Sequence, residues 1–181
     1  MTVTDTLRHE HQVVLLTLDA AEKESQTIRS SGKVRVDRLG QMVDFFRVFV
    51  DRCHHGKEEK HLFPLMKKRC AARAGGPIAI LLKEHKEGRA MVKDMARALP
   101  KAAKGDGRAA SALCQNLMAY VRLIRNHTDK EDDVIYPMAD EILSRIDQQT
   151  LGRAFDRVES KEMGEGVHEK YHQLAHDLAK G

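Results

Sequence analysis

Apolar residues recur every three or four positions through most of this chain, and that spacing predicts long amphipathic helices. Two such helices are predicted over residues 36–65 and 109–138. Two more are predicted over residues 5–29 and 77–99, starting at Thr4 or Asp5 and at Pro77. Breaks rich in Gly, Ser or Pro separate the four helices, at residues 30–32, 74–77 and 100–107.

The short breaks predict an antiparallel up-and-down bundle in which consecutive helices pack side by side. We therefore expect an all-α fold, with a four-helix bundle over residues 1–142 and a C-terminal extension over residues 143–181. The extension is expected to form one or two helices, broken around residues 163–166, that pack on the bundle. Pro64 is expected to end or kink the second helix.

The composition agrees with helices and excludes several classes of protein. Tryptophan is absent, aromatic residues make up 4% of the chain, and 181 residues suffice for one buried core. The net charge of +4 comes with 27 acidic residues scattered among the basic ones, which argues against a nucleic-acid partner. The three cysteines form no C-x-x-C pair, no apolar run could span a membrane, and the first residues lack a signal peptide. We expect a cytoplasmic protein without a membrane partner.

A repeated motif carries the chemistry of the chain. The sequence CHHGKEEKHLFP at residues 53–64 returns 73 residues later as NHTDKEDDVIYP. Each copy places a histidine four residues before a glutamate, His54 with Glu58 and His127 with Glu131. Residues four apart share one face of a helix, so each pair can reach the same ion, and two pairs indicate a two-metal site.

The repeat extends to Glu10-His11 and Glu84-His85, which are 74 residues apart. Both histidines fall on apolar stripes and are expected to point inward. Six inward polar residues are costly to bury unless they are paired or bind a cation, and imidazole with carboxylate suits iron, manganese or zinc. The candidate metal ligands are His11, His54, Glu58, His85, His127 and Glu131. In this arrangement the two glutamates bridge two ions and two histidines complete each one.

Other residues near the motif have competing interpretations. A second His-x-x-x-Glu pair, His55 with Glu59, shares its face with Asp51, and the repeat replaces His55 by Thr128, so this pair is disfavoured. Tyr120 lies two turns before His127 and could contact the metal site or its oxidants, or could be a buried tyrosine bonded to a core group.

Gly88 lies one turn after His85. It could give room for a close helix contact or a small ligand near the metal, or be a tolerated surface residue.

The tail contains His168-Glu169-Lys170-Tyr171-His172, which matches the H-E-x-x-H pattern of zinc proteases. A catalytic zinc needs a third protein ligand, and the next histidine, His176, would be roughly 12 Å from His168 along one helix. A fifth helix packed on the bundle, with His172 near the metal pocket, is therefore preferred to a metalloprotease. The role of the three histidines stays open.

The order His, His-x-x-x-Glu, His, His-x-x-x-Glu, with the endings LFP and IYP, resembles the hemerythrin-like (HHE cation-binding) domains of bacteria. The resemblance covers residues 5–142 and implies a four-helix bundle around a non-haem diiron centre with an oxo or hydroxo bridge. It also implies that the six candidate residues are its ligands, with manganese or zinc as the less favoured metals. The tail sequence GVHEKYH is similar to an extension found in some bacterial members.

The chain departs from the oxygen-carrying hemerythrins, because Arg89 stands where they have a second histidine on the third helix and Glu131 replaces a more distant aspartate. It resembles instead the iron-centre-repair and mycobacterial-type proteins. The resemblance implies a small ligand, O2, H2O2 or NO, that binds to or reacts with the diiron centre, and an enzymatic peroxide- or NO-consuming activity stays open. The alternatives are a non-catalytic iron or oxygen sensor, an iron-storage or donor protein, and a scaffold without metal.

Overall fold

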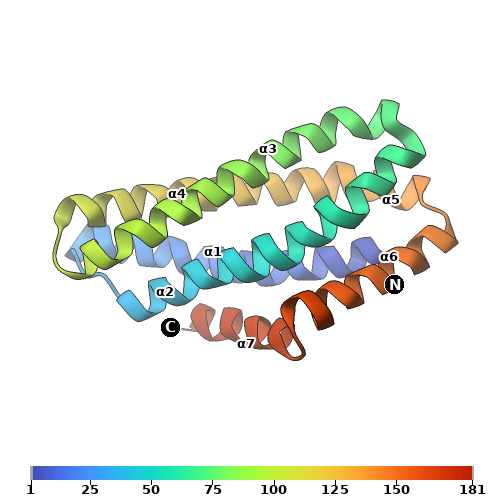
Figure 1. Cartoon of the computed structure of the whole chain (residues 1–181). Helices are drawn as coiled ribbons and strands as arrows, with labels where there is room; N and C mark the ends of the chain where they lie inside the picture. Colours follow the sequence, from blue (N-terminus) through green and yellow to red (C-terminus); the bar gives the residue numbers. More distant parts are fainter. Residues whose placement is uncertain (1, 181) are drawn as a thin grey trace.

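The computed structural model describes residues 2–180, which are helical almost throughout and include no strand. Long helical stretches lie side by side, and the chain after residue 143 returns along one side of them (Figure 1). The all-α prediction is confirmed. The α-helices are α1 (Val3–Ser31), α2 (Val36–Phe45), α3 (Phe63–Ala103), α4 (Gly107–Lys130), α5 (Tyr136–Ile142), α6 (Arg145–Arg157) and α7 (Val167–Lys180). Four π-helical segments interrupt them: η1 (Phe46–His55), η2 (Glu58–Leu62), η3 (Glu131–Ile135) and η4 (Val158–Met163).

Two of the π-helical segments stand at repeat-related positions and begin at Glu58 and Glu131. The N–H of Phe63 donates to the carbonyl of Glu58, and the N–H of Tyr136 donates to that of Glu131, five residues back in each case. A proline follows directly in both copies, and its missing N–H and its ring disrupt the α-helical bonding of the preceding turn. The wider turn accommodates the proline, so the helix continues through it.

The second helix therefore does not end at Pro64, which was one of the two outcomes predicted for this proline. The chain leaves helical geometry at Cys70 instead, where φ is −154° and ψ is 73°. The expected break at residues 74–77 is also misplaced, because Gly75, Gly76 and Pro77 are already helical.

The first helix starts slightly earlier than expected. Thr2 caps α1, and Asp5 closes a capping box with it by accepting from the Thr2 N–H. The helix ends at Gly32, whose φ of 67° favours glycine. Between these two ends α1 is long enough to contribute residues to both apolar clusters of the core, which are described next.

The apolar core is divided into two clusters along the helices. Leu7, Phe63 and Met66 belong to the cluster at one end, and Val14 and Phe45 belong to the other. The candidate residue His11 lies between Leu7 and Val14 on α1. The candidate polar residues thus form a layer enclosed by apolar side chains on both sides, where water has little access.

The C-terminal extension packs along the rest of the protein rather than projecting from it. Helix α5 ends at Ile142, and Ser144 caps α6 with Asp147 in a second capping box. Helices α6 and α7 contact α1, and η4 contacts η1. The expected break lies at Gly164 and Gly166, which both have positive φ. Met1 and Gly181, at the outer ends of the two expected domains, lie outside the described residues.

Candidate metal centre

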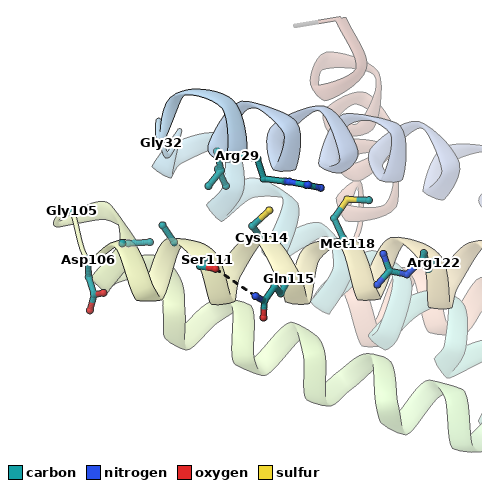
Figure 2. A pocket seen from close by; sticks show the side chains of 13 residues that line it. Arg29, Gly32, Gly105, Asp106, Ser111, Cys114, Gln115, Met118 and Arg122 are labelled. Atoms are coloured by element: carbon teal, nitrogen blue, oxygen red, sulfur yellow. Dashed lines mark hydrogen bonds between the residues drawn. The ribbon is translucent and has the colours of Figure 1, made fainter.

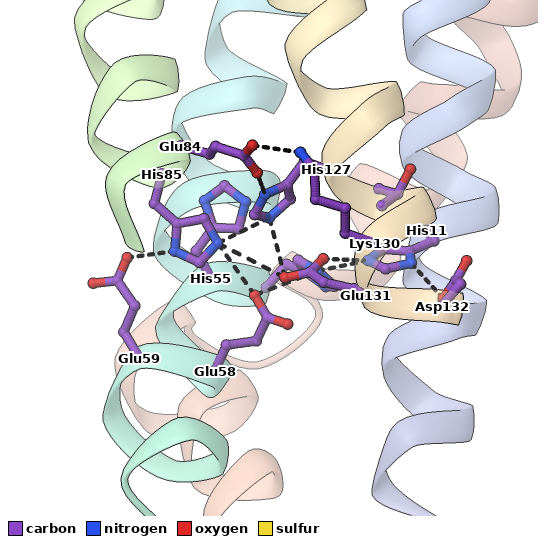
Figure 3. A network of polar contacts seen from close by, with 12 residues as sticks. His11, His55, Glu58, Glu59, Glu84, His85, His127, Lys130, Glu131 and Asp132 are labelled. Atoms are coloured by element: carbon purple, nitrogen blue, oxygen red, sulfur yellow. Dashed lines mark hydrogen bonds and ion pairs between the residues drawn. The ribbon is translucent and has the colours of Figure 1, made fainter. Parts of the chain in front are cut away.

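The fold brings the six candidate residues together from both halves of the chain. Figure 3 labels all of them except His54. Each is at most 2% exposed. Every long helical stretch contributes at least one of them. They are His11 on α1, His54 on η1, Glu58 on η2, His85 on α3, His127 on α4 and Glu131 on η3.

The four imidazoles form two pairs whose Nε2 atoms face each other. The Nε2 atoms of His11 and His54 are 3.0 Å apart, and those of His85 and His127 are also 3.0 Å apart. Two facing imidazole nitrogens cannot both be hydrogen-bond acceptors, so one must carry a proton or both must bind a common cation. The arrangement provides two positions, each with two imidazole donors.

The two glutamates lie between the imidazole pairs. Glu131 places one oxygen 3.2 Å from His11 Nε2 and the other 3.1 Å from His127 Nε2. Glu58 Oε2 is 3.5 Å from His85 Nε2 and 3.9 Å from His54 Nε2. Each carboxylate therefore faces one imidazole of each pair, as a bridging ligand would.

Three of these carboxylate oxygens are buried without a well-formed hydrogen bond, namely Glu58 Oε2 and both oxygens of Glu131. Leaving buried carboxylate oxygens unsatisfied is costly. Two cations with mixed imidazole and carboxylate coordination would satisfy them, and that donor set suits iron, manganese and zinc. The residues present thus fit a pair of metal ions.

A second layer of carboxylates orients the histidines. Each imidazole uses its Nδ1 to donate to a carboxylate, which leaves Nε2 directed at the centre. The Nδ1 to oxygen distances are 2.9 Å for His11 with Asp132, 2.8 Å for His54 with Glu10, 2.7 Å for His85 with Glu59 and 2.9 Å for His127 with Glu84.

These four carboxylates are repeat-related in two pairs, Glu10 with Glu84 and Glu59 with Asp132. In the sequence the first pair only marks the repeat, and Glu59 stands out only as the partner of His55 in the disfavoured ligand pair. The 73-residue offset already aligned Glu59 with Asp132 in the sequence. That alignment was the available signal for an outer layer of carboxylates.

The electrostatics of the centre shows where positive charge is favoured. Burial disfavours the imidazolium of His11, but the hydrogen bond to Asp132 and the neighbouring Glu131 carboxylate outweigh it and raise the pKa of His11 from 6.5 to about 9. Burial opposes charge on His127 too, yet Glu131 and Glu84 raise its pKa to about 9. Although burial acts against it, these two histidines hold the pKa of Glu131 well below its usual range.

Glu58 behaves in the opposite way. Burial and the nearby Glu131 carboxylate raise the pKa of Glu58 well above its usual range. Burial also lowers the pKa of His54 and His85. Without metal the centre thus favours positive charge on His11 and His127 around an ionised Glu131, and it disfavours the ionised form of Glu58. Protons occupy the places where cations would neutralise the same groups.

His55 differs from its expected position. It was expected on a polar face with Asp51, but it is only 3% exposed and stacks on His85, with ring centroids 3.7 Å apart. The cause is η1, because π-helical turns hold more than 3.6 residues and bring both His54 and His55 inward. One donor atom from each of His55, Glu58, His85 and His127 lies within 4.8 Å of the others. Helical periodicity could not reveal this position.

Tyr120 packs its ring 4.5 Å from that of Phe46 and against Gly88. These residues and His55 help to line a pocket of about 260 Å³. The tyrosine that contacts the centre is Tyr136, whose hydroxyl donates to Glu58 Oε1 at 2.8 Å and lies 3.3 Å from His11 Nε2. In the repeat Tyr136 corresponds to Phe63, 73 residues earlier, and that correspondence gives no sign of a hydroxyl contact.

The tail histidines approach the outer layer of carboxylates. His168 Nε2 is 3.0 Å from Glu10 Oε1, and the rings of His168 and His172 are 4.6 Å apart. Glu10, Cys53 and His168 could together hold an ion, but Lys57 already donates its ammonium hydrogen to Glu10 at that place. The H-E-x-x-H segment thus contributes to the surroundings of Glu10.

A separate pocket of about 640 Å³ lies at the far end of the long helices (Figure 2). It is lined by residues that include Arg29, Cys114 and Arg122. Arg29 is 18 residues from His11 on α1, which places it roughly 27 Å along the helix axis from that ligand. This pocket is therefore distinct from the candidate metal centre.

Among residues 2–180, no helix is both long enough and apolar enough to cross a membrane.

Comparisons with known proteins agree with the geometry. No solved structure gives a significant match. An uncharacterized protein of Mycobacterium bovis and two of Mycobacterium tuberculosis are each 23% identical over 180 residues, covering 99% of this chain and 70% of the relative. The family model of the hemerythrin HHE cation-binding domain matches residues 2–139, which is most of the chain. The chain therefore belongs to the hemerythrin HHE cation-binding domain family.

Proposed function

We propose that this protein is an antiparallel four-helix hemerythrin-like bundle whose centre binds two iron ions and reacts with a small oxidant, O2, H2O2 or NO. His11 and His54 would hold one ion, and His85 and His127 the other. Glu58 and Glu131 would bridge them. The observation that carries the proposal is the pair of facing Nε2 atoms on each side of carboxylate oxygens that lack hydrogen bonds.

When bound, the iron pair would supply the electrons that a small oxidant accepts. The protein residues have other roles. The outer carboxylates hold the Nδ1 protons and fix the imidazole rings, and the surrounding apolar clusters exclude water. Tyr136 holds its hydroxyl proton toward Glu58, so a proton donor stands beside the proposed bridge.

The 260 Å³ pocket is the proposed approach for the small ligand. Its lining includes the apolar side chains of Phe46 and Val92, with Arg89 among its polar residues. His55 lines this pocket and also stacks on His85, so its ring separates the pocket from the centre. The pocket is small, so its size suits O2, NO or H2O2 better than a large substrate.

The test is the metal content of protein purified without a metal-affinity tag, together with its absorption spectrum before and after peroxide. About two irons per chain and near-ultraviolet charge-transfer bands of a bridged pair are expected. Replacing either bridging residue, by Glu58→Ala or Glu131→Ala, is expected to remove roughly half or more of the iron. Full iron retention in both variants, or one zinc with a featureless spectrum, would refute the diiron centre.

The second candidate is a non-catalytic iron or oxygen sensor, and the contact between the tail and Glu10 favours it. His168 lies 3.0 Å from the carboxylate that orients His54. Residues 143–180 would then report the state of the centre to a partner. Steady turnover with peroxide or NO would support the oxidant-consuming protein, whereas stoichiometric reaction without turnover would support the sensor.

A further inference from the structure

The two halves of the centre share an outer pattern of contacts that differs in one respect. In each half a lysine one residue before the bridging glutamate donates to the carboxylate that orients a histidine. Lys57 donates to Glu10 in one half, and Lys130 donates to Glu84 in the other. The side chain of Lys130 is 45% exposed, but that of Lys57 is fully buried.

The C-terminal extension causes this difference. Glu159 on η4 accepts from Lys57 Nζ at 2.5 Å, and the ring of Phe155 on α6 lies 5.6 Å from the same ammonium. His168 on α7 lies 3.0 Å from Glu10 Oε1. Three segments of the extension therefore surround the Lys57–Glu10 pair.

Glu10 connects the C-terminal extension to the candidate ligand His54. Glu10 uses its other oxygen, Oε2, to hold His54 Nδ1 at 2.8 Å. Its Oε1 meets Lys57 and His168. A carboxylate that shares its charge among more donors is a weaker acceptor for each of them, so His168 and Lys57 adjust both the orientation and the basicity of His54.

We propose that Glu159 and His168 are positioning residues that make the two metal positions hold iron with unequal strength. They do so by coupling the position at His11 and His54 to the C-terminal extension. Behind His127 lies the partly exposed Lys130–Glu84 pair, and behind His85 lies Glu59, which also accepts from Arg89. None of these four residues belongs to the C-terminal extension. Because linkage is reciprocal, an ion at the first position also strengthens docking of the extension. This inference rests on the proposed two-ion centre.

The experiment measures release of iron from the full-length, iron-loaded protein to a ferrous chelator under reducing conditions. The wild-type protein is expected to release its two ions in two phases. The variants His168→Ala and Glu159→Gln should speed release from the position at His11 and His54 by about three- to ten-fold and leave the other phase unchanged. Loss of a residue that bonds directly to a metal ligand typically costs 10–100-fold in affinity, and these two residues act one step further out. Lys130→Ala should speed the other phase.

Tyr171→Phe is the matched control for loosening of the extension alone. It removes the 2.5 Å hydrogen bond from Tyr171 to Asp44 on α2 and leaves Glu10 untouched. This variant should release iron as the wild type does. Mössbauer spectra of protein loaded with 57Fe should show two sites, of which His168→Ala alters one.

Release of both ions in one phase in every variant, or equal acceleration of both phases by His168→Ala, would overturn the inference while leaving the two-ion centre intact. Wild-type protein that holds no pair of ions would instead refute the proposed function. Acceleration by Tyr171→Phe equal to that by His168→Ala would also overturn the inference, since it would show that Glu10 is not the point of contact.

Discussion

The two bridging glutamates should differ sharply in how much they stabilise the metal-free protein, although they are equivalent in the repeat. Two charged imidazoles favour the ionised form of Glu131, whereas burial and the neighbouring Glu131 favour the protonated form of Glu58. Glutamine resembles a protonated glutamate in shape and charge. We therefore expect Glu58→Gln to change the stability of the metal-free fold little and Glu131→Gln to reduce it strongly.

The magnitude follows from the histidines. Raising the pKa of an imidazole from 6.5 to about 9 is worth roughly 3 kcal/mol at a pH below both values and about 2.5 kcal/mol at pH 7, and both His11 and His127 have this shift. Removing one partner of a buried ion pair typically costs about 3–5 kcal/mol. The glutamine amide can still accept from one neutral imidazole, so we expect the lower end, about 3 kcal/mol, and a fall in Tm of roughly 10 °C.

The assay is urea or thermal unfolding of the three proteins at pH 7 after removal of metal with a chelator. Iron loading of the same samples is the control, because both variants remove one bridging ligand and should both lose iron. Equal destabilisation by the two substitutions, or a larger effect of Glu58→Gln, would refute the assignment of charge within the centre.

Three further outcomes are expected. The raised pKa values of His11 and His127 stabilise the metal-free fold below pH 6.5, and this contribution is lost as the pH rises through about 9. Iron affinity should instead rise over the same range, because the ligands lose their protons. Unfolding curves and iron titrations at pH 6 and 9.5 check both signs. Gly88→Val should narrow the pocket beside Tyr120 and slow oxidation of the reduced protein without lowering its iron content, as stopped-flow absorbance would show. Phe45→Ala should cost about 3–5 kcal/mol in urea unfolding, because Phe45 is fully buried.

Much of this architecture was predictable because helical periodicity and the repeat act together. The start of α2 at Val36 and the inward positions of His11 and His85 follow from apolar stripes with a period of 3.6 residues. Convergence of the six candidate residues follows from the repeat, since equivalent positions on paired helices face each other.

The parts that were not predicted are those where the backbone leaves that period. The π-helical turns carry the chain through Pro64, and η1 turns His55 inward. The contact of His168 with Glu10 joins residues 158 positions apart, and no local pattern encodes it. Tyr136 was overlooked because its partner in the repeat, Phe63, lacks a hydroxyl group.

The outer carboxylates connect the two halves of the chain as the subunits of a symmetric dimer would be connected. Glu10 orients His54 within the first half, but Glu59 of the first half orients His85 of the second, and Asp132 of the second orients His11 of the first. A two-fold pair of identical half-chains could make every one of these contacts. Within one chain the two halves need not have identical sequences. One half can therefore bury its lysine, Lys57, under the C-terminal extension while the other keeps Lys130 in contact with solvent.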